Sequence, residues 1–513
     1  MEQYAIKMKN ITKKFGHVIA NKNINLELKS GEILSLLGEN GSGKTTLMNM
    51  LGGIYYPDEG SIEIMGEPAT IASPKDSFKY GIGMIHQHFK LVDVFTAAEN
   101  IILGLEGDKG KLDRQNINKA INEIATRYGF DIDPDKKVYD MSVSEKQTVE
   151  IVKVLYRGAD ILILDEPTAV LTPQEVEKLF LIMRNMKEDG KAIIIITHHL
   201  QEVMEISDRV AILRKGEYIG CVNKEDTSIQ ELTDMMVGRS VSLNINCPKH
   251  ENPQELLRVE NITNIDREGV KQLDNVSFSA YGGEILGIAG IAGSGQKELL
   301  EAISGIQPLS KESKIIYKKE DGSEINLVTM DPLDIINHGI LLSFVPEDRF
   351  GMGLVGGMNI VDNIKLRTYR EGKGVLVNNK IPSKEAKEIV ENLEVVCSDI
   401  DKTPIRRLSG GNVQKVLVGR EIACNPRVLM TAYAVRGLDI NTSYTIYDLL
   451  TKQKMSGVAV IYVGEDLDVL LSISDRILVL CGGKVSGILD ARATTKEEIG
   501  LYMTQVGGGK NND

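Results

Sequence analysis

Short apolar runs alternate with amphipathic stretches along the whole chain. The runs "EILSLLG" (32–38), "DILILDE" (160–166) and "KAIIIITH" (191–198) have the length of strands, whereas "PQEVEKLFLIMRNMKE" (173–188) has the apolar spacing of a helix. Strands that are apolar on both faces suit a parallel sheet that helices cover on both sides. The pattern therefore predicts an α/β fold.

A long internal repeat divides the chain. The segment "NITKKFGHVIANKNINLELKSGEILSLLGENGSGKTTL" from residue 10 aligns with "NITNIDREGVKQLDNVSFSAYGGEILGIAGIAGSGQKEL" from residue 261. A repeat of this length is a duplicated domain and not a solenoid unit. We expect one domain at 1–243 and a second at 256–505, joined by a polar linker at 244–255 that contains two prolines. The residues 506–513, "VGGGKNND", are expected to form a flexible tail.

Composition narrows the functional class. The chain has 513 residues, 42% of them apolar, and a formal net charge of −12, which disfavours a protein that binds nucleic acid through phosphate contacts. The five cysteines are scattered and never form C-x-x-C, so neither a disulfide framework nor a zinc site is expected. The opening residues lack the apolar core of a signal peptide, and no apolar run is long enough to span a bilayer. A reducing cytosol is the simplest location.

A glycine-rich loop supplies the first candidate chemistry. Residues 38–45, "GENGSGKT", match G-x-x-x-x-G-K-[ST] in full and lie between a predicted strand and a predicted helix. The glycines let backbone N–H groups point at phosphates, and the helix adds its positive end. Lys44 would reach the β- and γ-phosphates, and Thr45 would bind Mg²⁺. The expected ATP-binding residues are Gly38, Glu39, Asn40, Gly41, Ser42, Gly43, Lys44, Thr45 and Thr46.

An acidic pair follows the strand "ILIL". Asp165 and Glu166 stand at the carboxyl end of this strand, where open α/β sheets place their ligands. Asp165 would hold Mg²⁺ through water, and Glu166 would act as the general base for the attacking water. The alternative is an acidic pair that only favours the start of a helix.

Three further side chains are candidates for the same site. His198 ends another apolar strand and could contact the γ-phosphate, although His199 is equally available by sequence. Gln87, in "GMIHQHF", could sense Mg²⁺ and the water. Phe15 precedes the first long strand and could stack on adenine, with a place in the core as the alternative.

These elements and their order resemble the nucleotide-binding domains of ABC transporters, and "LSGGNVQKVLVGREI" from Leu408 is similar to the ABC signature. The resemblance covers nearly the whole chain. It implies two tandem ABC-type P-loop NTPase domains, each with a mostly parallel core sheet, an antiparallel subdomain and a helical subdomain. "TAVLTPQE" and "VPEDR" (345–349) are typical of the twin-cassette ATPases of simple-sugar and nucleoside importers. "GIGMIHQHF" and "LYRGADILILDEPTAVLTPQE" look most like the nucleoside-uptake branch.

In that family two cassettes dock head to tail, and each ATP lies between the phosphate loop of one and the signature of the other. The resemblance therefore implies a complete first site. Its catalytic residues would be Lys44, Gln87, Glu166 and His198, and its metal residues Thr45, Gln87 and Asp165. The second copy would contribute Ser409, Gly410, Gly411, Asn412 and Asp439 to ATP binding.

The second composite site keeps the glycines Gly290, Gly293 and Gly295 of its loop, but each of its parts is altered. In its loop "GIAGSGQK" (290–297), Gln296 stands where the lysine should be and Lys297 where the metal-binding hydroxyl should be. Ala432 and Tyr433 replace the acidic pair. The remaining changes are Glu347 for Gln87, Glu465 for His198, Arg267 at the aromatic position, and Val143 and Ser144 for the signature glycines. The losses sort by composite site and not by domain, so we expect one hydrolytic site per chain. A purely structural helix cap is the alternative role for "LSGGN".

The resemblance also implies cofactors and partners. ATP and Mg²⁺ would be bound, and two transmembrane permease subunits would hold the chain at the cytoplasmic face of the cell membrane as a peripheral subunit. An extracytoplasmic solute-binding lipoprotein would act indirectly, and no nucleic acid is expected. Residues 88–105 would contact the permeases, unless they are core. The alternative function is a soluble twin-cassette factor acting on ribosomes; a repair ATPase would need zinc-binding cysteine clusters, which are missing from this sequence.

Overall fold

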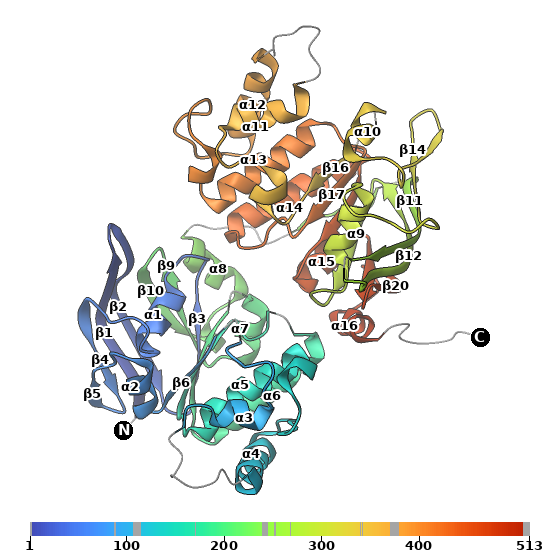
Figure 1. The fold of residues 1–513 in the computed structure, drawn as a ribbon. Coiled ribbons are helices and arrows are strands. Elements are labelled where there is room, and N and C mark those ends of the chain that lie inside the picture. The colour runs from blue at the N-terminus through green and yellow to red at the C-terminus, as the bar shows by residue number, and fades with distance from the viewer. Residues whose placement is uncertain are drawn as a thin grey trace. The chain divides into compact units, whose positions relative to one another are not determined.

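The computed structural model describes residues 3–86, 89–105, 114–169, 171–197, 199–238, 245–250, 253–266, 268–338, 340, 342–369 and 379–505. The chain divides into two compact units, residues 1–242 and 243–513, which we call unit 1 and unit 2. Both are α/β, as the alternating pattern predicts (Figure 1).

Parallel strands form the centre of unit 1. Their order is β6-β7-β8-β3-β9, with β3 next to both β8 and β9. Successive residues of β7 enter different hydrophobic clusters: Ile161 and Ile163 pack on one face of the sheet, and Leu162 and Leu164 on the other. This two-sided burial explains the continuous apolar runs. The strands are β3 (Ile33–Leu37), β6 (Ile82–Ile85), β7 (Ile161–Asp165), β8 (Ala192–Ile196) and β9 (Arg209–Arg214).

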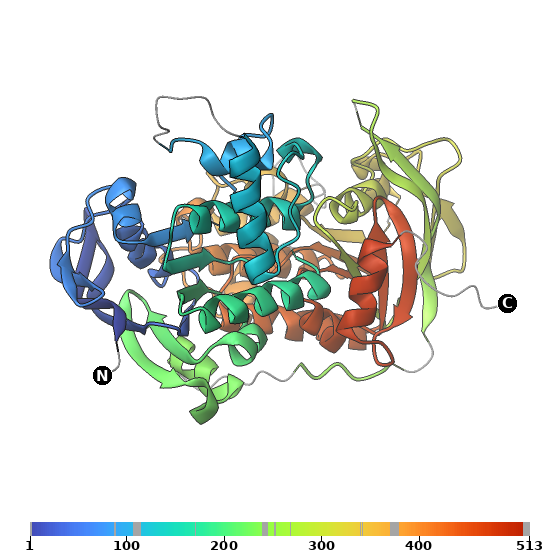
Figure 2. The ribbon, with the colours of Figure 1, turned by 90° about the horizontal axis from the view of Figure 1, so that it is seen from below.

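Antiparallel strands extend the same sheet of unit 1 to ten strands. The order continues from β9 through β10, β2, β1 and β4 to β5. In Figures 1 and 2 the strands nearest the N-terminus, in blue, lie together at one edge of this unit. Their bounds are β1 (Tyr4–Phe15), β2 (Val18–Lys29), β4 (Glu59–Ile64), β5 (Glu67–Ala69) and β10 (Glu217–Asn223).

The helices of unit 1 include a helical subdomain inserted before β7. Helices α3, α4 and α5 contact one another there, and their apolar side chains join the cluster on one face of the core sheet. The helices are α1 (Lys44–Leu51), α2 (Pro74–Lys79), α3 (Ala97–Ile102), α4 (Arg114–Tyr128), α5 (Val143–Tyr156), α6 (Pro173–Glu188), α7 (Leu200–Ile206) and α8 (Ile229–Val237). Short 3₁₀ turns occur at Val138–Asp140 and Lys224–Asp226.

Unit 2 repeats this plan with two separate sheets. Its core order is β16-β17-β18-β13-β19-β20, and its antiparallel sheet has the order β12-β11-β14-β15. The strands are β11 (Gln254–Ile265), β12 (Lys271–Gly282), β13 (Ile285–Gly290), β14 (Lys314–Lys318), β15 (Glu324–Asn326), β16 (Leu342–Val345), β17 (Val428–Ala432), β18 (Ala459–Val463), β19 (Arg476–Cys481) and β20 (Lys484–Asp490).

The helices of unit 2 also repeat those of unit 1. A subdomain of α11, α12 and α13 precedes β17. The helices are α9 (Gln296–Ile303), α10 (Pro332–Asn337), α11 (Ile360–Thr368), α12 (Lys380–Asn392), α13 (Gly410–Ala423), α14 (Ile440–Met455), α15 (Leu467–Ile473) and α16 (Lys496–Thr504). A π-helical turn, η3, spans Arg349–Gly353, and a 3₁₀ turn spans Ile405–Arg407.

Linker residues 245–250 pack onto unit 2. Ile245 and Cys247 lie against its hydrophobic core. Cys247 Sγ donates to the carbonyl oxygen of Ile473 (2.9 Å) and accepts from Lys454 Nζ (3.2 Å). Lys454 is fully buried and its ammonium group also contacts the carboxylate of Asp475 (2.8 Å). Burial raises the pKa of the Cys247 thiol.

The burial of the Lys454–Asp475 pair predicts that losing its carboxylate costs unit 2 more stability than the same change costs unit 1. Its counterpart in unit 1, Lys187–Asp208 (2.6 Å), has a lysine side chain that is 35% exposed. Asp475→Asn would leave a buried ammonium without its counter-charge and should destabilise unit 2 by about 3 kcal/mol. Asp208→Asn should cost unit 1 no more than about 1 kcal/mol, because water replaces the lost partner.

The chain has no tryptophan whose fluorescence could report unfolding. The unfolding of each unit should therefore be measured by hydrogen exchange of its own peptides in increasing urea. Both carboxylates accept a backbone N–H, from Ile285 and Ile33 respectively, so this local role is matched in the two variants. Equal losses in the two units would show that the burial of Lys454 does not set the difference.

Candidate phosphate-binding site

The loop 38–45 of unit 1 joins β3 to the start of α1. Gly41 and Gly43 have positive φ angles of 79° and 98°, which favour glycine. A Cβ atom on Gly43 would approach the carbonyl oxygen of Ala20 to 2.4 Å, so this position also lacks room for a side chain. Since α1 begins at Lys44, its first N–H groups face the loop, as anion binding requires.

Lys44 folds back over this loop. The residue is only 6% exposed, and its Nζ donates to the carbonyl oxygens of Gly38 (2.6 Å) and Glu39 (3.0 Å). Burial lowers the pKa of Lys44, and the nearby charges of Glu166 and Asp165 oppose that shift. The predicted phosphate-binding lysine and the acidic pair are therefore in electrostatic contact within one unit.

The acidic pair stands at the end of β7, as the sequence pattern predicts. Asp165 is the last residue of the strand and is buried. Burial raises its pKa to about 6, and the charge of Glu166 adds to the shift, while Lys44 and the hydroxyl of Thr45 oppose it. Glu166 has a positive φ of 48°, and its N–H donates to the carbonyl oxygen of Ile196 in β8. The chain thus holds two carboxylates where ionising both is costly.

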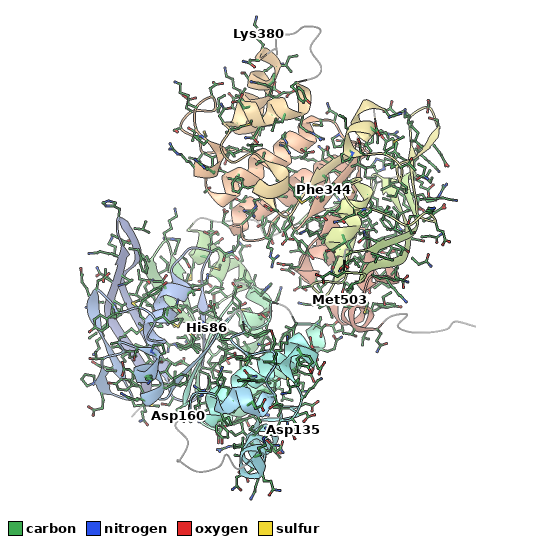
Figure 3. All side chains as sticks on the ribbon, viewed as in Figure 1. His86, Asp135, Asp160, Phe344, Lys380 and Met503 are labelled. Atoms are coloured by element: carbon green, nitrogen blue, oxygen red, sulfur yellow. The ribbon has the colours of Figure 1, made fainter. Side chains whose placement is uncertain are left out.

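Three predicted site residues, Gln87, His198 and Arg267, lie outside the described residues. Next to the first of them is His86, which directly follows β6 and is labelled in Figure 3. Burial lowers the pKa of His86, and Lys90 adds to that shift. Thr197, the residue before His198, is buried and its hydroxyl donates to Glu202 (3.1 Å).

Phe15 ends β1 and is 43% exposed. Its ring contacts Tyr55 edge-to-face, with centroids 5.1 Å apart, and the ammonium group of Lys13 lies 5.6 Å from the ring centre. This exposure is unlike that of a core residue and leaves a ring surface on which a base could stack.

The loop 290–297 of unit 2 has the same backbone but other side chains. Gly293 and Gly295 have φ angles of 84° and 99°, close to those of their counterparts in unit 1. Gln296 takes the place of Lys44: it is 2% exposed, and its amide donates to the carbonyl oxygen of Ile291 (3.1 Å). Lys297 turns instead toward Glu301 (3.8 Å), one helical turn further along α9.

The loops beyond β16, β17 and β18 in unit 2 carry a cation that sequence reasoning missed. Arg436 lies between Glu347 (2.5 Å) and Glu465 (3.1 Å), and its guanidinium is 5.8 Å from the centre of the Tyr433 ring. Burial, together with Glu465 and Glu347, raises the pKa of Tyr433 to about 12. The sequence held one sign of this cation: when the two copies are aligned, Arg436 stands where the first copy has Ala169.

The predicted signature begins α13. Ser409 caps this helix by accepting from the N–H of Asn412 (3.4 Å), and Gly410 and Gly411 form its first turn. Asp439, which we expect to contact the ATP, caps α14, and its two carboxylate oxygens accept from the N–H and the hydroxyl of Thr442 (both 2.8 Å).

Unit 1 has the corresponding cap without the glycines. Ser142 and Glu145 form a reciprocal capping box at the start of α5, and Val143 and Ser144 follow the cap. Capping alone therefore does not require the two glycines of unit 2.

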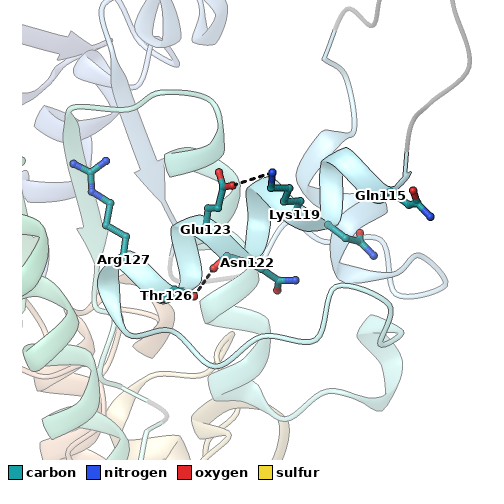
Figure 4. Close-up of a pocket in the computed structure, with 7 residues that line it drawn as sticks. Gln115, Lys119, Asn122, Glu123, Thr126 and Arg127 are labelled. Atoms are coloured by element: carbon teal, nitrogen blue, oxygen red, sulfur yellow. Dashed lines mark hydrogen bonds and ion pairs between the residues drawn. The ribbon is translucent and has the colours of Figure 1, made fainter.

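The pocket in Figure 4 lies apart from this chemistry. Polar side chains of one helix, α4, line it, among them Lys119, Glu123 and Arg127. Within the described ranges no group of three or more His, Cys, Asp or Glu side chains is arranged to hold a metal ion, and no helix is long and apolar enough to cross a membrane.

Comparison with known proteins identifies the family. The model described as "ABC transporter" matches residues 21–169 and 273–431, one match in each unit. The chain belongs to the ABC transporter family. The family resemblance and the twin-cassette α/β fold predicted from the motifs are thereby confirmed, and this ABC transporter ATPase couples ATP hydrolysis to import.

Full-length relatives refine the likeness of this ABC protein. It is 42% identical over 511 residues to the nucleoside import ATP-binding protein NupA of Lactococcus lactis, with 99% of each chain covered. It is 43% identical over 518 residues to the guanosine import ATP-binding protein NupO of Bacillus subtilis, covering 99% of this chain and 100% of that one. The glucose import ATP-binding protein TsgD13 of Haloferax volcanii is 38% identical over 537 residues, with 98% and 96% covered.

The raised pKa of Asp165 predicts that Asp165→Asn stabilises the nucleotide-free protein by an amount that depends on pH. The folded value of about 6 lies above the ordinary value of 3.8, so ionisation of Asp165 costs the folded state stability. The variant should be more stable than wild type by about 1–3 kcal/mol above pH 7. The gain should decrease as the pH falls through 6 and vanish only below about pH 3, where the aspartate is protonated in both states.

Urea unfolding between pH 4 and pH 8 measures this effect. Asp160→Asn is the control, because Asp160 lies just before the same strand (Figure 3) but is exposed and paired with Lys191. A gain that does not change with pH would show that Asp165 is ionised without cost.

Proposed function

We propose that this chain is the ATP-hydrolysing subunit of a nucleoside importer and that it has one hydrolytic ATP site per chain. The single observation that carries the proposal is the meeting of Lys44, Thr45 and the Asp165–Glu166 pair at one phosphate loop. Unit 2 repeats the backbone of that loop and has none of these side chains at the matching positions.

The side chains of unit 1 suit a metal–triphosphate. The N–H groups of the loop and the ammonium group of Lys44 would bind the phosphates. Thr45 and Asp165 would hold Mg²⁺, which neutralises phosphate charge when bound. They fit that ion, because the pKa of Asp165 is raised by a burial that a bound cation would offset. Glu166 would then accept a proton from the attacking water.

The site is completed in this proposal by the signature of unit 2. Ser409 and the N–H groups of Gly410 and Gly411 would contact the γ-phosphate of the ATP held by unit 1, in the head-to-tail arrangement typical of the family. The distribution of losses supports this pairing. The glycines persist in the copy that has lost its catalytic side chains, and Val143 and Ser144 replace them in the copy that keeps those side chains.

Both units offer a surface to a membrane partner. In unit 1, buried Asn100 pins the loop before α3 by accepting from the N–H of Val92 (2.8 Å) and donating to its carbonyl oxygen (3.1 Å). In unit 2, buried Asn363 makes the same two bonds with Val355 (2.8 and 3.1 Å). Both valines are exposed, as are Val94, Leu103 and Leu105 nearby. We infer that each loop contacts one permease subunit, which keeps the chain at the cytoplasmic face of the membrane.

One substitution in each unit tests the number of hydrolytic sites. Glu166→Gln should reduce ATP turnover by at least about 100-fold, because it removes the general base. Gln296→Ala, in the loop of unit 2, should leave most of the turnover. Steady-state phosphate release from the purified chain measures both. Turnover that survives Glu166→Gln, or that Gln296→Ala abolishes, would contradict a single site in unit 1.

The proposed solute is tested by transport. The nucleoside assignment is supported by the two relatives whose names state nucleoside and guanosine import. A strain that lacks this chain should lose uptake of labelled nucleosides and keep uptake of labelled glucose, ribose and xylose. The wild-type gene should restore uptake, whereas Glu166→Gln should not. Loss of monosaccharide uptake alone would make this a sugar importer, and normal uptake of all these solutes would contradict a role in importing them.

A further inference from the structure

Arg436 joins the loops at the carboxyl ends of three neighbouring strands in unit 2. It lies between β17 and α14, while Glu347 follows β16 and Glu465 follows β18 by two residues each. Its Nη1 donates to Glu347 Oε1 (2.5 Å), and its Nε is 3.1 Å from Glu465 Oε1. The guanidinium therefore lies at the edge of the sheet where α/β folds hold their ligands.

The corresponding turn of unit 1 has the same backbone but a small side chain. The N–H of Arg436 donates to the carbonyl oxygen of Tyr433 (3.1 Å), and the N–H of Ala169 donates to that of Glu166 (3.4 Å). Tyr433 and Glu166 also share a positive φ, of 50° and 48°. Ala169 has only a methyl group at this position in unit 1, whereas unit 2 has a cation there.

A second arginine extends the contact from this turn to the signature. Arg349 begins η3, and its Nη2 donates to the carbonyl oxygen of Arg436 (2.6 Å). Its Nη1 lies 3.2 Å from where a Cβ atom on Gly410 would be, so the guanidinium rests against the first residue of α13. On the other side, Asp439 comes within 3.2 Å of the corresponding point on Gly411. The loop 433–439 and its partners thus flank the signature turn on both sides.

We propose that Arg436 is a positioning residue for the signature turn 409–411. Its side chain fixes the loop 433–439 to Glu347 and Glu465, and its carbonyl oxygen fixes Arg349 beside Gly410. The turn is then held ready for phosphate by contacts within unit 2. This role rests on the proposed function, in which that turn completes the ATP site of unit 1.

The positioning role of Arg436 depends on the shape of its guanidinium group. Its planar fork contacts two carboxylates at once, which a lysine ammonium on a flexible stem does not reproduce. The side chain of Arg436 is 56% exposed, and exposed ion pairs add little to stability. We therefore expect its removal to loosen the signature turn without unfolding unit 2.

Hydrogen exchange of the nucleotide-free, full-length chain tests the positioning directly. Arg436→Ala should increase exchange about threefold or more in peptides that cover 407–414 and 433–440, through local opening of these segments. Glu465→Gln, which removes one of the two carboxylates, should give a smaller increase. Arg492→Ala is the control, because Arg492 is similarly exposed and pairs with Asp475 elsewhere in unit 2. It should leave both segments unchanged.

ATP hydrolysis by the same variants tests the consequence. Arg436→Ala should lower kcat/KM about tenfold, Arg436→Lys should give an intermediate loss, and Arg492→Ala none. Unchanged exchange in Arg436→Ala would overturn the proposal, as would altered exchange with an unaltered kcat/KM. If the proposed function is wrong, a different result is expected, namely ATP turnover that survives Glu166→Gln. In that case the exchange measurement alone would still support or refute the positioning of the turn by Arg436.

Discussion

Unbalanced negative charge at the end of β7 is the constraint around which the proposed nucleotide site of unit 1 is built. Asp165 is buried beside Glu166, and the ammonium group of Lys44 offsets their charge only in part, so the pKa of Asp165 stays near 6. Burying charges without full compensation costs stability. A fold that accepts this cost has a site where a bound cation would relieve it, so cation binding and folding of unit 1 would favour each other.

Unit 2 keeps the same loop backbone but has neutral side chains at the positions of Lys44, Asp165 and Glu166. Tyr433 has the φ angle of Glu166 but is neutral, and its raised pKa keeps it so. Gln296 occupies the position of Lys44 and satisfies its own loop with a neutral amide. The acids that remain, Glu347 and Glu465, share the guanidinium of Arg436. In the proposed function, duplication has separated two properties of one cassette: unit 1 keeps the catalytic side chains, and unit 2 keeps the backbone of the loop.

The sequence could predict features that depend on local backbone and burial. The strand runs, the duplicated plan and the phosphate loop of Gly38 to Thr45 follow from apolar periodicity and glycine spacing. Side-chain contacts between distant loops leave no such periodic trace. For that reason the contacts of Arg436 with Glu347 and Glu465, and the cap that Asp439 forms on α14, went unpredicted. Aligning the two copies suggested candidate site residues, but not the side chains that they contact.

The packing of residues 245–250 changes what counts as the second cassette. Cys247 covers the buried ammonium group of Lys454, and Arg492 donates to the carbonyl oxygen of Cys247 (3.2 Å). Residues 245–250 of the connecting peptide therefore pack against the core of that cassette and are not a passive spacer. A fragment that starts at the first strand, β11, would lack Cys247 and its contact with the buried ammonium group of Lys454. Any shortened version of the second cassette should therefore keep residues 245–250, which precede its first strand.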